Sequence, residues 1–174
     1  MWSFWFVEAG KDRWWEKNEA FDRLVYERYL DVYRQASRGE LFAWRREAQG
    51  WLAEIIVLDQ FPRNMFRGTA ESFATDSMAL VLSQEAVANG VDRELEDVQK
   101  SFLYMPLMHS ESALIHDTAV DLFSQPGLEH NLEFELKHKA IIDRFGRYPH
   151  RNALLGRVSS AEELEFLSQP GSSF

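Results

Sequence analysis

Asp59 is the residue of this sequence whose position most clearly demands a chemical explanation. It follows Leu52 and Ile55 at intervals of three and four residues, so a helix here would place the carboxylate on the same face as the aliphatic side chains. An isolated buried carboxylate costs several kcal/mol, so it must be paired or hydrogen-bonded. Arg63 and Arg67 follow within eight residues and are the expected partners.

Titratable residues also take apolar positions in later segments. Glu111 shares a predicted helical face with Leu114, and His138 shares one with Ile141. Asp76 lies in a similar but less apolar position. Several segments therefore place an ionisable group where an aliphatic residue is expected, and perturbed ionisable groups tend to gather at functional sites.

The connections between the apolar segments supply the complementary charge. They carry arginines and asparagines, which donate hydrogen bonds to anions, and two histidines, His109 and His150. We therefore predict a polar site at the ends of several helices. Its candidate binding residues are Arg63, Asn64, Arg67, Arg144, Arg147, Arg151 and Asn152.

Three functions are open for this predicted site. In the first, the arginines clamp a small anionic ligand or the carboxyl terminus of a peptide. In the second, the protein is a hydrolase or transferase that acts on an anionic small molecule. His109 or His150 would then be the acid or base, and Glu111 or Asp59 the carboxylate that orients it. In the third, the polar residues are structural and lock the stacking of helices.

Helical spacing of apolar residues runs through the whole chain. Pro62 and Pro106 are expected to end helices, Thr69 to cap one, and Ser160 with Glu163 to form a capping box. The predicted helices cover residues 20–36, 41–61, 70–89, 93–104, 110–123, 128–145 and 161–167.

Neither alternating strand patterns nor a linker interrupts these segments, so we predict one all-α domain over residues 1–174. Short connections favour antiparallel packing of successive helices. Stacked antiparallel helix pairs are typical of a right-handed, tetratricopeptide-like array, although a clean repeat of about 34 residues is not visible.

Composition argues against several classes of function. The net charge of −9 disfavours nucleic-acid binding, and the absence of cysteine excludes disulfides, thiolate chemistry and cysteine-bound zinc. We find neither a signal peptide nor an apolar run long enough for a bilayer, so we expect a cytoplasmic protein without membrane contact. Phosphate-binding glycine loops and metal-binding histidine motifs are also missing, and we expect no metal and no cofactor. The dipeptide His116-Asp117 resembles that of His-Asp phosphohydrolases, but His109, the nearest upstream histidine, is only seven residues away.

Three stretches of the chain closely resemble a bacterial family, domain of unknown function nine-two-four. They are LDQFPRNMFRGTAESFATD at 58–76, FLYMPLMHSES at 102–112 and RFGRYPHRNALLGR at 144–157, and the resemblance extends from residue 4 to residue 167. It implies an all-helical, tetratricopeptide-like fold and no established activity. Residues 113–123 depart from the more polar stretch expected there. The residues that match the family's motifs include Asp59, Gln60, Arg63, Asn64, Arg67, His109, Ser110, Glu111, Arg144, His150, Arg151 and Asn152.

Overall fold

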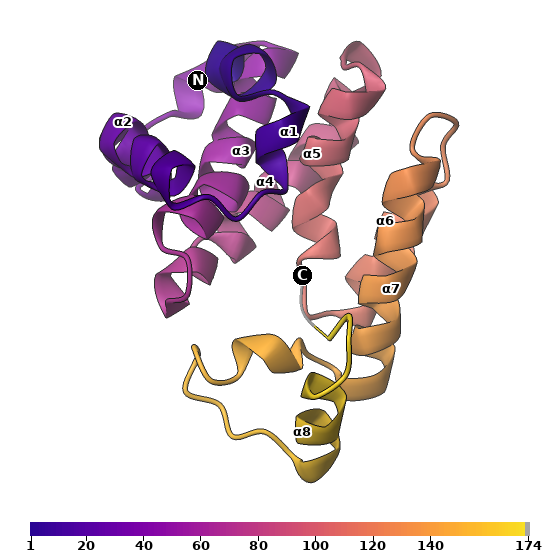
Figure 1. Ribbon diagram of the computed structural model, residues 1–174. Coiled ribbons are helices and arrows are strands. Elements are labelled where there is room, and N and C mark those ends of the chain that lie inside the picture. The colour runs from indigo at the N-terminus through magenta and orange to yellow at the C-terminus, as the bar shows by residue number, and fades with distance from the viewer. Residues whose placement is uncertain (173–174) are drawn as a thin grey trace.

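The computed structural model describes residues 1–172, which form helices joined by turns (Figure 1). Over that range there is no β-strand, and neighbouring helices pack in pairs, which confirms the all-α prediction. The α-helices are α1 (Lys11–Trp14), α2 (Glu19–Ser37), α3 (Ala48–Met65), α4 (Asp76–Ala88), α5 (Asp97–Met108), α6 (Ala113–Phe123), α7 (Glu129–Phe145) and α8 (Ala161–Leu167). Shorter helical turns are η1 (Phe4–Ala9), η2 (Phe42–Arg46), η3 (Ala70–Phe73), η4 (Val91–Glu94) and η5 (Pro149–Arg151).

Helix α3 is the centre of the main hydrophobic core. It packs against α2, α4 and α5, and every residue from Leu52 to Pro62 is buried. Aromatic side chains of the amino-terminal turn η1 close one end of this core. Trp5 lies 5.6 Å from the ring of Phe61 and 5.7 Å from that of Phe102. A helix that is covered on all sides can carry a polar side chain only where a partner meets it.

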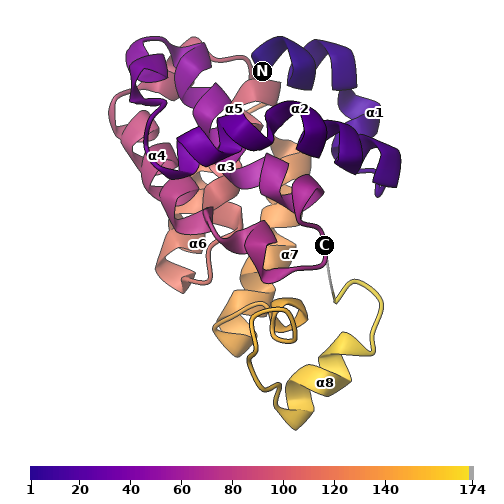
Figure 2. The same ribbon diagram turned by 90° about the vertical axis from the view of Figure 1, so that its left-hand side faces the viewer.

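The carboxyl-terminal third of the chain extends from this core as a hairpin of α6 and α7. Helix α6 packs against both α5 and α7, and α8 lies beyond the far end of α7 in both views (Figures 1 and 2). A second, smaller hydrophobic cluster forms there around Ile141, Ile142 and Tyr148, with Phe166 of α8 packed against it. The segment between α7 and α8 therefore has its own apolar anchor beside the main core.

Pro62 lies inside α3, so the helix end expected at this residue is wrong. A proline cannot donate a hydrogen bond to the carbonyl four residues earlier, which belongs to Leu58. The hydroxyl of Thr75 donates to that carbonyl instead, over 2.6 Å. The helix continues to Met65 as a result, and its last turn carries Arg63.

Pro106 is likewise inside a helix, because α5 runs to Met108 instead of ending at residue 104. The Ser83 hydroxyl donates to the carbonyl of Leu103 in the same turn. The start of α5 also lies later than expected, at Asp97, because a capping box precedes that residue.

Other predicted boundaries are also wrong. Residues 70–89 are not one helix, because the turn η3 ends at Phe73 and α4 begins at Asp76. Residues 41–61 are not one helix, because the tight turn η2 precedes α3 and the backbone of Trp44 meets Gly50, which has no side chain to obstruct it. Thr69 is the N-cap residue of η3, but its hydroxyl donates to the carbonyl of Phe66 and makes no capping hydrogen bond. The capping box at Ser160 is confirmed.

The packed antiparallel helix pairs are as expected, whereas the tetratricopeptide-like handedness of the array stays a prediction. Along residues 1–172 we find no helix whose length and apolar character would suit a membrane span.

Candidate functional site

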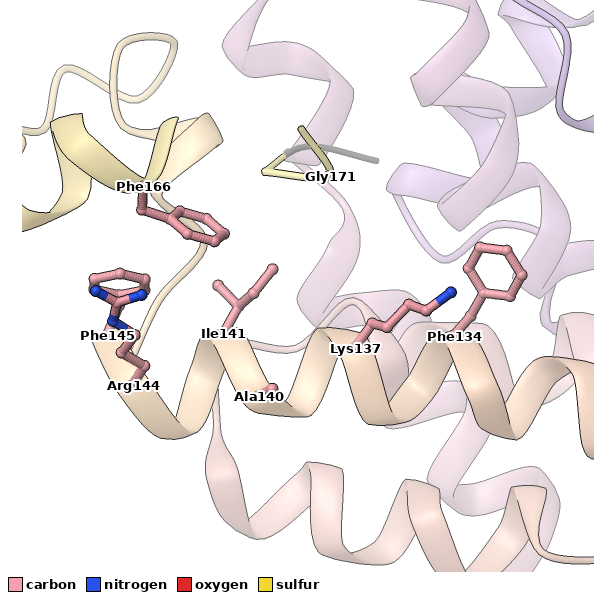
Figure 3. A pocket seen from close by; sticks show the side chains of 8 residues that line it. All are labelled: Phe134, Lys137, Ala140, Ile141, Arg144, Phe145, Phe166 and Gly171. Carbon is pink, nitrogen blue, oxygen red and sulfur yellow. The ribbon is translucent and has the colours of Figure 1, made fainter. Parts of the chain in front are cut away.

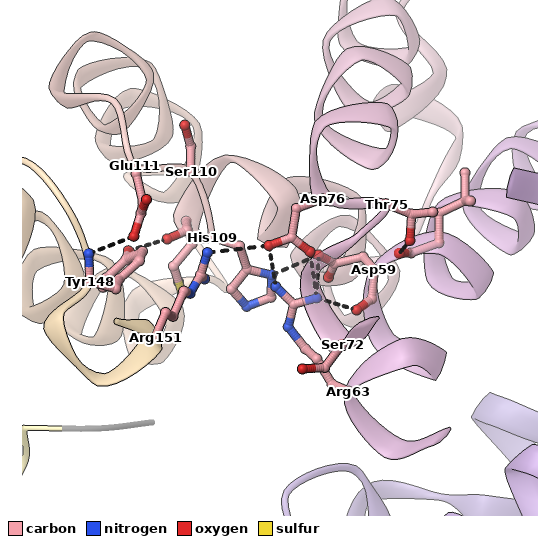
Figure 4. A network of polar contacts seen from close by, with 12 residues as sticks. Asp59, Arg63, Ser72, Thr75, Asp76, His109, Ser110, Glu111, Tyr148 and Arg151 are labelled. Carbon is pink, nitrogen blue, oxygen red and sulfur yellow. Dashed lines mark hydrogen bonds and ion pairs between the residues drawn. The ribbon is translucent and has the colours of Figure 1, made fainter. Parts of the chain in front are cut away.

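The carboxylate of Asp59 and the imidazole of His109 form a pair between α3 and the carboxyl end of α5 (Figure 4). Nδ1 of His109 lies 2.7 Å from Oδ1 of Asp59, whose side chain is 1% exposed. The amide of Gln60 donates to the second carboxylate oxygen over 2.5 Å. The prediction that Asp59 is buried and paired is therefore confirmed, and its main partner is a histidine 50 residues further along the chain.

Arg63 joins this pair to the start of α4. Its guanidinium lies 3.4 Å from Oδ1 of Asp59 and donates to both carboxylate oxygens of Asp76, over 2.9 and 3.1 Å. It also donates to the backbone carbonyl of Asp59. Asp76 in turn accepts one longer bond of 3.3 Å from Arg151, which comes from the turn η5 (Figure 4). Two arginines from distant segments thus meet at one carboxylate.

Glu111 faces the same region from the loop that follows α5. The expected helix over residues 110–123 begins only at Ala113, so the placement of Glu111 on an apolar helical face is wrong. Its carboxylate accepts bonds of 2.6 and 2.9 Å from Arg157 and one of 2.7 Å from the backbone N–H of Tyr148. These bonds hold the loop after α5 against the carboxyl-terminal turn.

A pocket of about 240 Å³ opens beside these groups. Its polar side combines acids, a histidine, an arginine and two serines, and its other walls are apolar. His109 lines the pocket, and its Nε2 has no hydrogen-bond partner within residues 1–172. The lining residues are Phe73, Asp76, Ser77, Leu80, Pro106, His109, Ser110, Glu111, Arg151 and Leu155.

The electrostatic environment fixes the protonation of the Asp59–His109 pair. Burial would raise the pKa of Asp59, but Arg63 and His109 outweigh burial and hold it well below its ordinary value. Burial and the charge of Arg63 lower the pKa of His109, against the attraction of Asp59. At neutral pH the carboxylate is therefore ionised and the imidazole neutral. Nδ1–H then donates to Asp59, and Nε2 keeps a free electron pair on the side of the pocket.

Arg151 is the least satisfied arginine of this region. Its side chain is 8% exposed, and its guanidinium lies between two aromatic rings, 4.7 Å from the centre of Phe73 and 4.5 Å from that of Tyr148. The 3.3 Å bond to Asp76 is its single side-chain hydrogen bond within the described chain, and its buried Nε has no partner there. Stacking holds the guanidinium in place while most of its N–H groups stay unused.

The structure brings five predicted residues together at this place and distributes the others elsewhere. Asp59, Arg63, His109, Glu111 and Arg151 line the pocket or contact a residue that does. Asp59, Glu111 and the turn that carries Tyr148 and Arg151 lie on one side of the molecule (Figure 4).

Arg67 and Asn64 contact a different acid. Both donate to Asp22 of α2, over 2.6 and 2.8 Å from Arg67 and 2.8 Å from Asn64, so Arg67 as a partner of Asp59 is wrong. These bonds tie the end of α3 to α2.

The remaining predicted residues belong to the carboxyl-terminal segment. Arg144 pairs with Glu162, and Arg147 pairs with Glu163, each across the turn to α8. Asn152 is fully buried and donates to Ser159. Burial lowers the pKa of His150 to about 4, and its ring lies 5.6 Å from Tyr148 rather than in the pocket wall.

A second buried histidine–carboxylate pair lies next to the pocket and was missed by the sequence analysis. Nδ1 of His116 lies 2.6 Å from Oε1 of Glu135, and both side chains are fully buried. Nε2 of His116 lies 2.9 Å from the carbonyl of Ser110, which can only accept, so this nitrogen must carry a proton. Burial raises the pKa of Glu135, which favours its protonated form in this buried pair.

One further residue of the site escaped prediction, and a second was placed among the weaker cases. Arg157, the partner of Glu111, lies in a turn-rich stretch where nothing distinguishes it from other surface arginines. Asp76 was noted only as a weaker case, yet it joins both arginines of the network. No local pattern marks Glu135, since the need for a partner becomes visible only when α6 and α7 pack.

A larger hollow of about 630 Å³ runs along α7 toward α8 (Figure 3). Its floor is mainly aromatic and aliphatic, and Lys137 and Arg144 lie along it (Figure 3). Arg144 is paired with Glu162, and among residues 1–172 neither a histidine nor an acidic residue lines this hollow, so it lacks the histidine–carboxylate pair found beside the smaller pocket.

Comparisons with known proteins identify a bacterial family and a solved structure of the same fold. The model of a family described as "Bacterial protein of unknown function (DUF924)" matches residues 1–171. A solved structure of a protein of unknown function from Agrobacterium tumefaciens is 38% identical, with a TM-score of 0.90 over 95% of this chain and 94% of the other. A search of curated proteins finds no significant match.

Proposed function

The chain belongs to the bacterial family of unknown function DUF924, and we propose that it is an enzyme which acts on a small anionic molecule in the pocket beside His109. The reaction class is hydrolysis or group transfer. One observation carries the proposal: a histidine oriented by a buried carboxylate presents its free nitrogen to a pocket of about 240 Å³.

The proposed roles follow from the contacts. His109 is the general base, since its neutral imidazole can take a proton through Nε2 from water or from a substrate hydroxyl. Asp59 fixes the ring orientation and stabilises the imidazolium that forms, as the buried carboxylate does in histidine-based triads. Arg151 provides the unused N–H groups for the anionic part of the substrate.

Binding without catalysis is the second candidate, and the state of Arg151 favours it equally. The other arginines support it less, because Arg63 already donates to Asp76 and pairs with Asp59, and Arg67 already donates to Asp22. The anion would therefore meet one available guanidinium rather than the clamp of several arginines that the sequence suggests.

The test is a turnover screen with small anionic esters and amides, such as monomethyl succinate and N-acetylglycine, followed by proton NMR. We expect His109→Gln to reduce the rate of any substrate found by about 100-fold or more. His130→Gln is the matched control, because the side chain of His130 is 81% exposed and does not line the pocket. The rate should stay constant from pH 8 to about 6.5 and fall at lower pH, where His109 becomes protonated.

Equal rates for the wild type and His109→Gln would contradict the assignment of His109. If the wild type binds members of the panel but converts none of them, the enzymatic proposal fails and the binding candidate replaces it.

A further inference from the structure

We infer that the ligand of the His109 pocket is a small monocarboxylate with a short apolar body, held by Arg151. This inference rests on the proposed function for the choice of site. It concerns recognition, however, and does not require that His109 catalyse any reaction.

The donors come from Arg151. Its Nη1 makes one long bond of 3.3 Å to Asp76, and its Nη2 makes none within residues 1–172. Rings of Phe73 and Tyr148 on either side prevent the guanidinium from rotating freely, at 4.7 and 4.5 Å. A carboxylate matches two parallel N–H groups of a fixed guanidinium, which is the geometry this residue presents.

The charge of the surroundings favours a monoanion. Asp76 and Glu111 both line the pocket. Asp76 accepts two hydrogen bonds from Arg63, and Glu111 accepts two from Arg157. Acidic and arginine side chains are equal in number in and directly around the pocket: Asp59, Asp76, Glu111, Arg63, Arg151 and Arg157. These charges balance without a ligand, so a monoanion at Arg151 leaves the site with one net negative charge and a dianion leaves it with two. A phosphate dianion would bring a second charge close to two carboxylates, with no further cation available.

The remaining walls set the size and polarity of the ligand body. Phe73, Leu80, Pro106 and Leu155 form an apolar surface opposite the polar groups. A volume of about 240 Å³ holds about eight non-hydrogen atoms if each takes about 30 Å³. A carboxylic acid of five to seven carbon atoms, roughly, fills this space with its chain on the apolar walls.

Ligand-observed NMR and isothermal titration calorimetry with hexanoate test the inference. The matched ligands are hexanamide, which lacks the charge, butyl phosphate, which is a dianion at pH 8, and dodecanoate, which is too long. We expect hexanoate to bind at least tenfold more tightly than each of the three. We expect Arg151→Met to weaken hexanoate binding at least tenfold, and Arg151→Lys to weaken it too, because lysine keeps the charge but not the paired donors.

Arg144→Met is the control for the larger hollow along α7, where Arg144 and Lys137 could also attract a carboxylate. Thermal melting and circular dichroism show whether each variant is folded, and Arg151→Lys serves if Arg151→Met is not. Equal binding of hexanoate and hexanamide, tighter binding of butyl phosphate, or a loss caused by Arg144→Met instead of the Arg151 variants would each overturn the inference.

The same data separate this inference from the proposed enzyme. If hexanoate binds through Arg151 and His109→Gln leaves that affinity unchanged while the turnover screen finds no reaction, recognition stands and catalysis fails. If turnover depends on His109 but the Arg151 variants leave substrate affinity unchanged, catalysis stands and the inference about recognition fails.

Discussion

Replacing Asp59 by asparagine separates the charge of this residue from its shape. Asparagine fits the space of the carboxylate, but it removes the negative charge that faces His109 and Arg63. The carboxylate is fully enclosed, with 1% of its side chain exposed, so water cannot replace the lost interaction.

The expected cost follows from the partners that remain. Breaking a buried ion pair by removing one partner costs about 3–5 kcal/mol. Arg63 keeps its two bonds to Asp76, at 2.9 and 3.1 Å, so the loss should lie near the lower limit. We therefore expect Asp59→Asn to lower the free energy of unfolding by about 3 kcal/mol, which is about 6–12 °C in melting temperature for a chain of this size. Asp59→Ala should cost more, because the Gln60 amide then loses its oxygen acceptor and keeps only its bond to the sulfur of Met105.

Urea denaturation followed by tryptophan fluorescence measures this change, and NMR titration of the histidine ring protons measures the pKa of His109. That pKa should fall further below its ordinary value in Asp59→Asn, because the carboxylate that raises it is gone. Asp31→Asn is the control, since Asp31 pairs with Arg34 at the surface and should change stability by less than about 0.5 kcal/mol. If Asp59→Asn lowers the free energy of unfolding by less than about 1 kcal/mol and leaves the His109 titration unchanged, Asp59 is not the buried, ionised partner of His109 and Arg63.

Three other outcomes follow from the structure. Burial lowers the pKa of His138 to about 3 and that of His150 to about 4, below the ordinary 6.5, so stability should fall as the pH drops from 6.5 toward these values. At pH 5 the two histidines together should cost about 4 kcal/mol relative to pH 7, measured by urea midpoints. Glu135→Gln should keep stability at pH 7 within about 1 kcal/mol, because glutamine mimics the protonated acid. The wild type should lose stability as the pH rises from 4.5 through the raised pKa of Glu135, and Glu135→Gln should not show this loss, because glutamine does not titrate. Arg67→Met should cost about 1 kcal/mol in a urea titration, because its bond to Asp22 is only partly shielded, with 38% of the arginine side chain exposed.

Controls for these three measurements come from the same chain. His130→Gln removes an exposed histidine and should leave the loss of stability between pH 7 and pH 5 unchanged. Glu135→Ala should cost about 3 kcal/mol or more, because it leaves Nδ1 of His116 without its partner. A Glu135→Gln protein as unstable as Glu135→Ala would show that Glu135 is ionised in the wild type. An Arg67→Met loss above about 3 kcal/mol would mean that Asp22 is more buried than its 15% exposure indicates.

The sequence by itself determined the helices and their class. Apolar spacing is a local property, so it placed α2, α7 and α8 and identified Asp59 as a carboxylate on a buried face. It failed at Pro62 and Pro106, where side chains from other segments replace or supplement the backbone bonds that a proline disrupts. A rule about neighbouring residues cannot include a hydroxyl that arrives from another helix.

The partners of the charged groups were decided by the tertiary structure alone. The chain contains 28 acidic residues, and an arginine can form an ion pair with any of them. The sequence therefore does not show which acidic residue pairs with which arginine. Arg67 pairs with Asp22 instead of Asp59, and His109 pairs with Asp59, which lies 50 residues earlier in the chain. Helix packing brings these groups within bonding distance and excludes water around them. Burial of α3 on all sides creates the requirement for a partner, and the packing of α4, α5 and the η5 turn against it determines which residue meets that requirement and where the pocket opens.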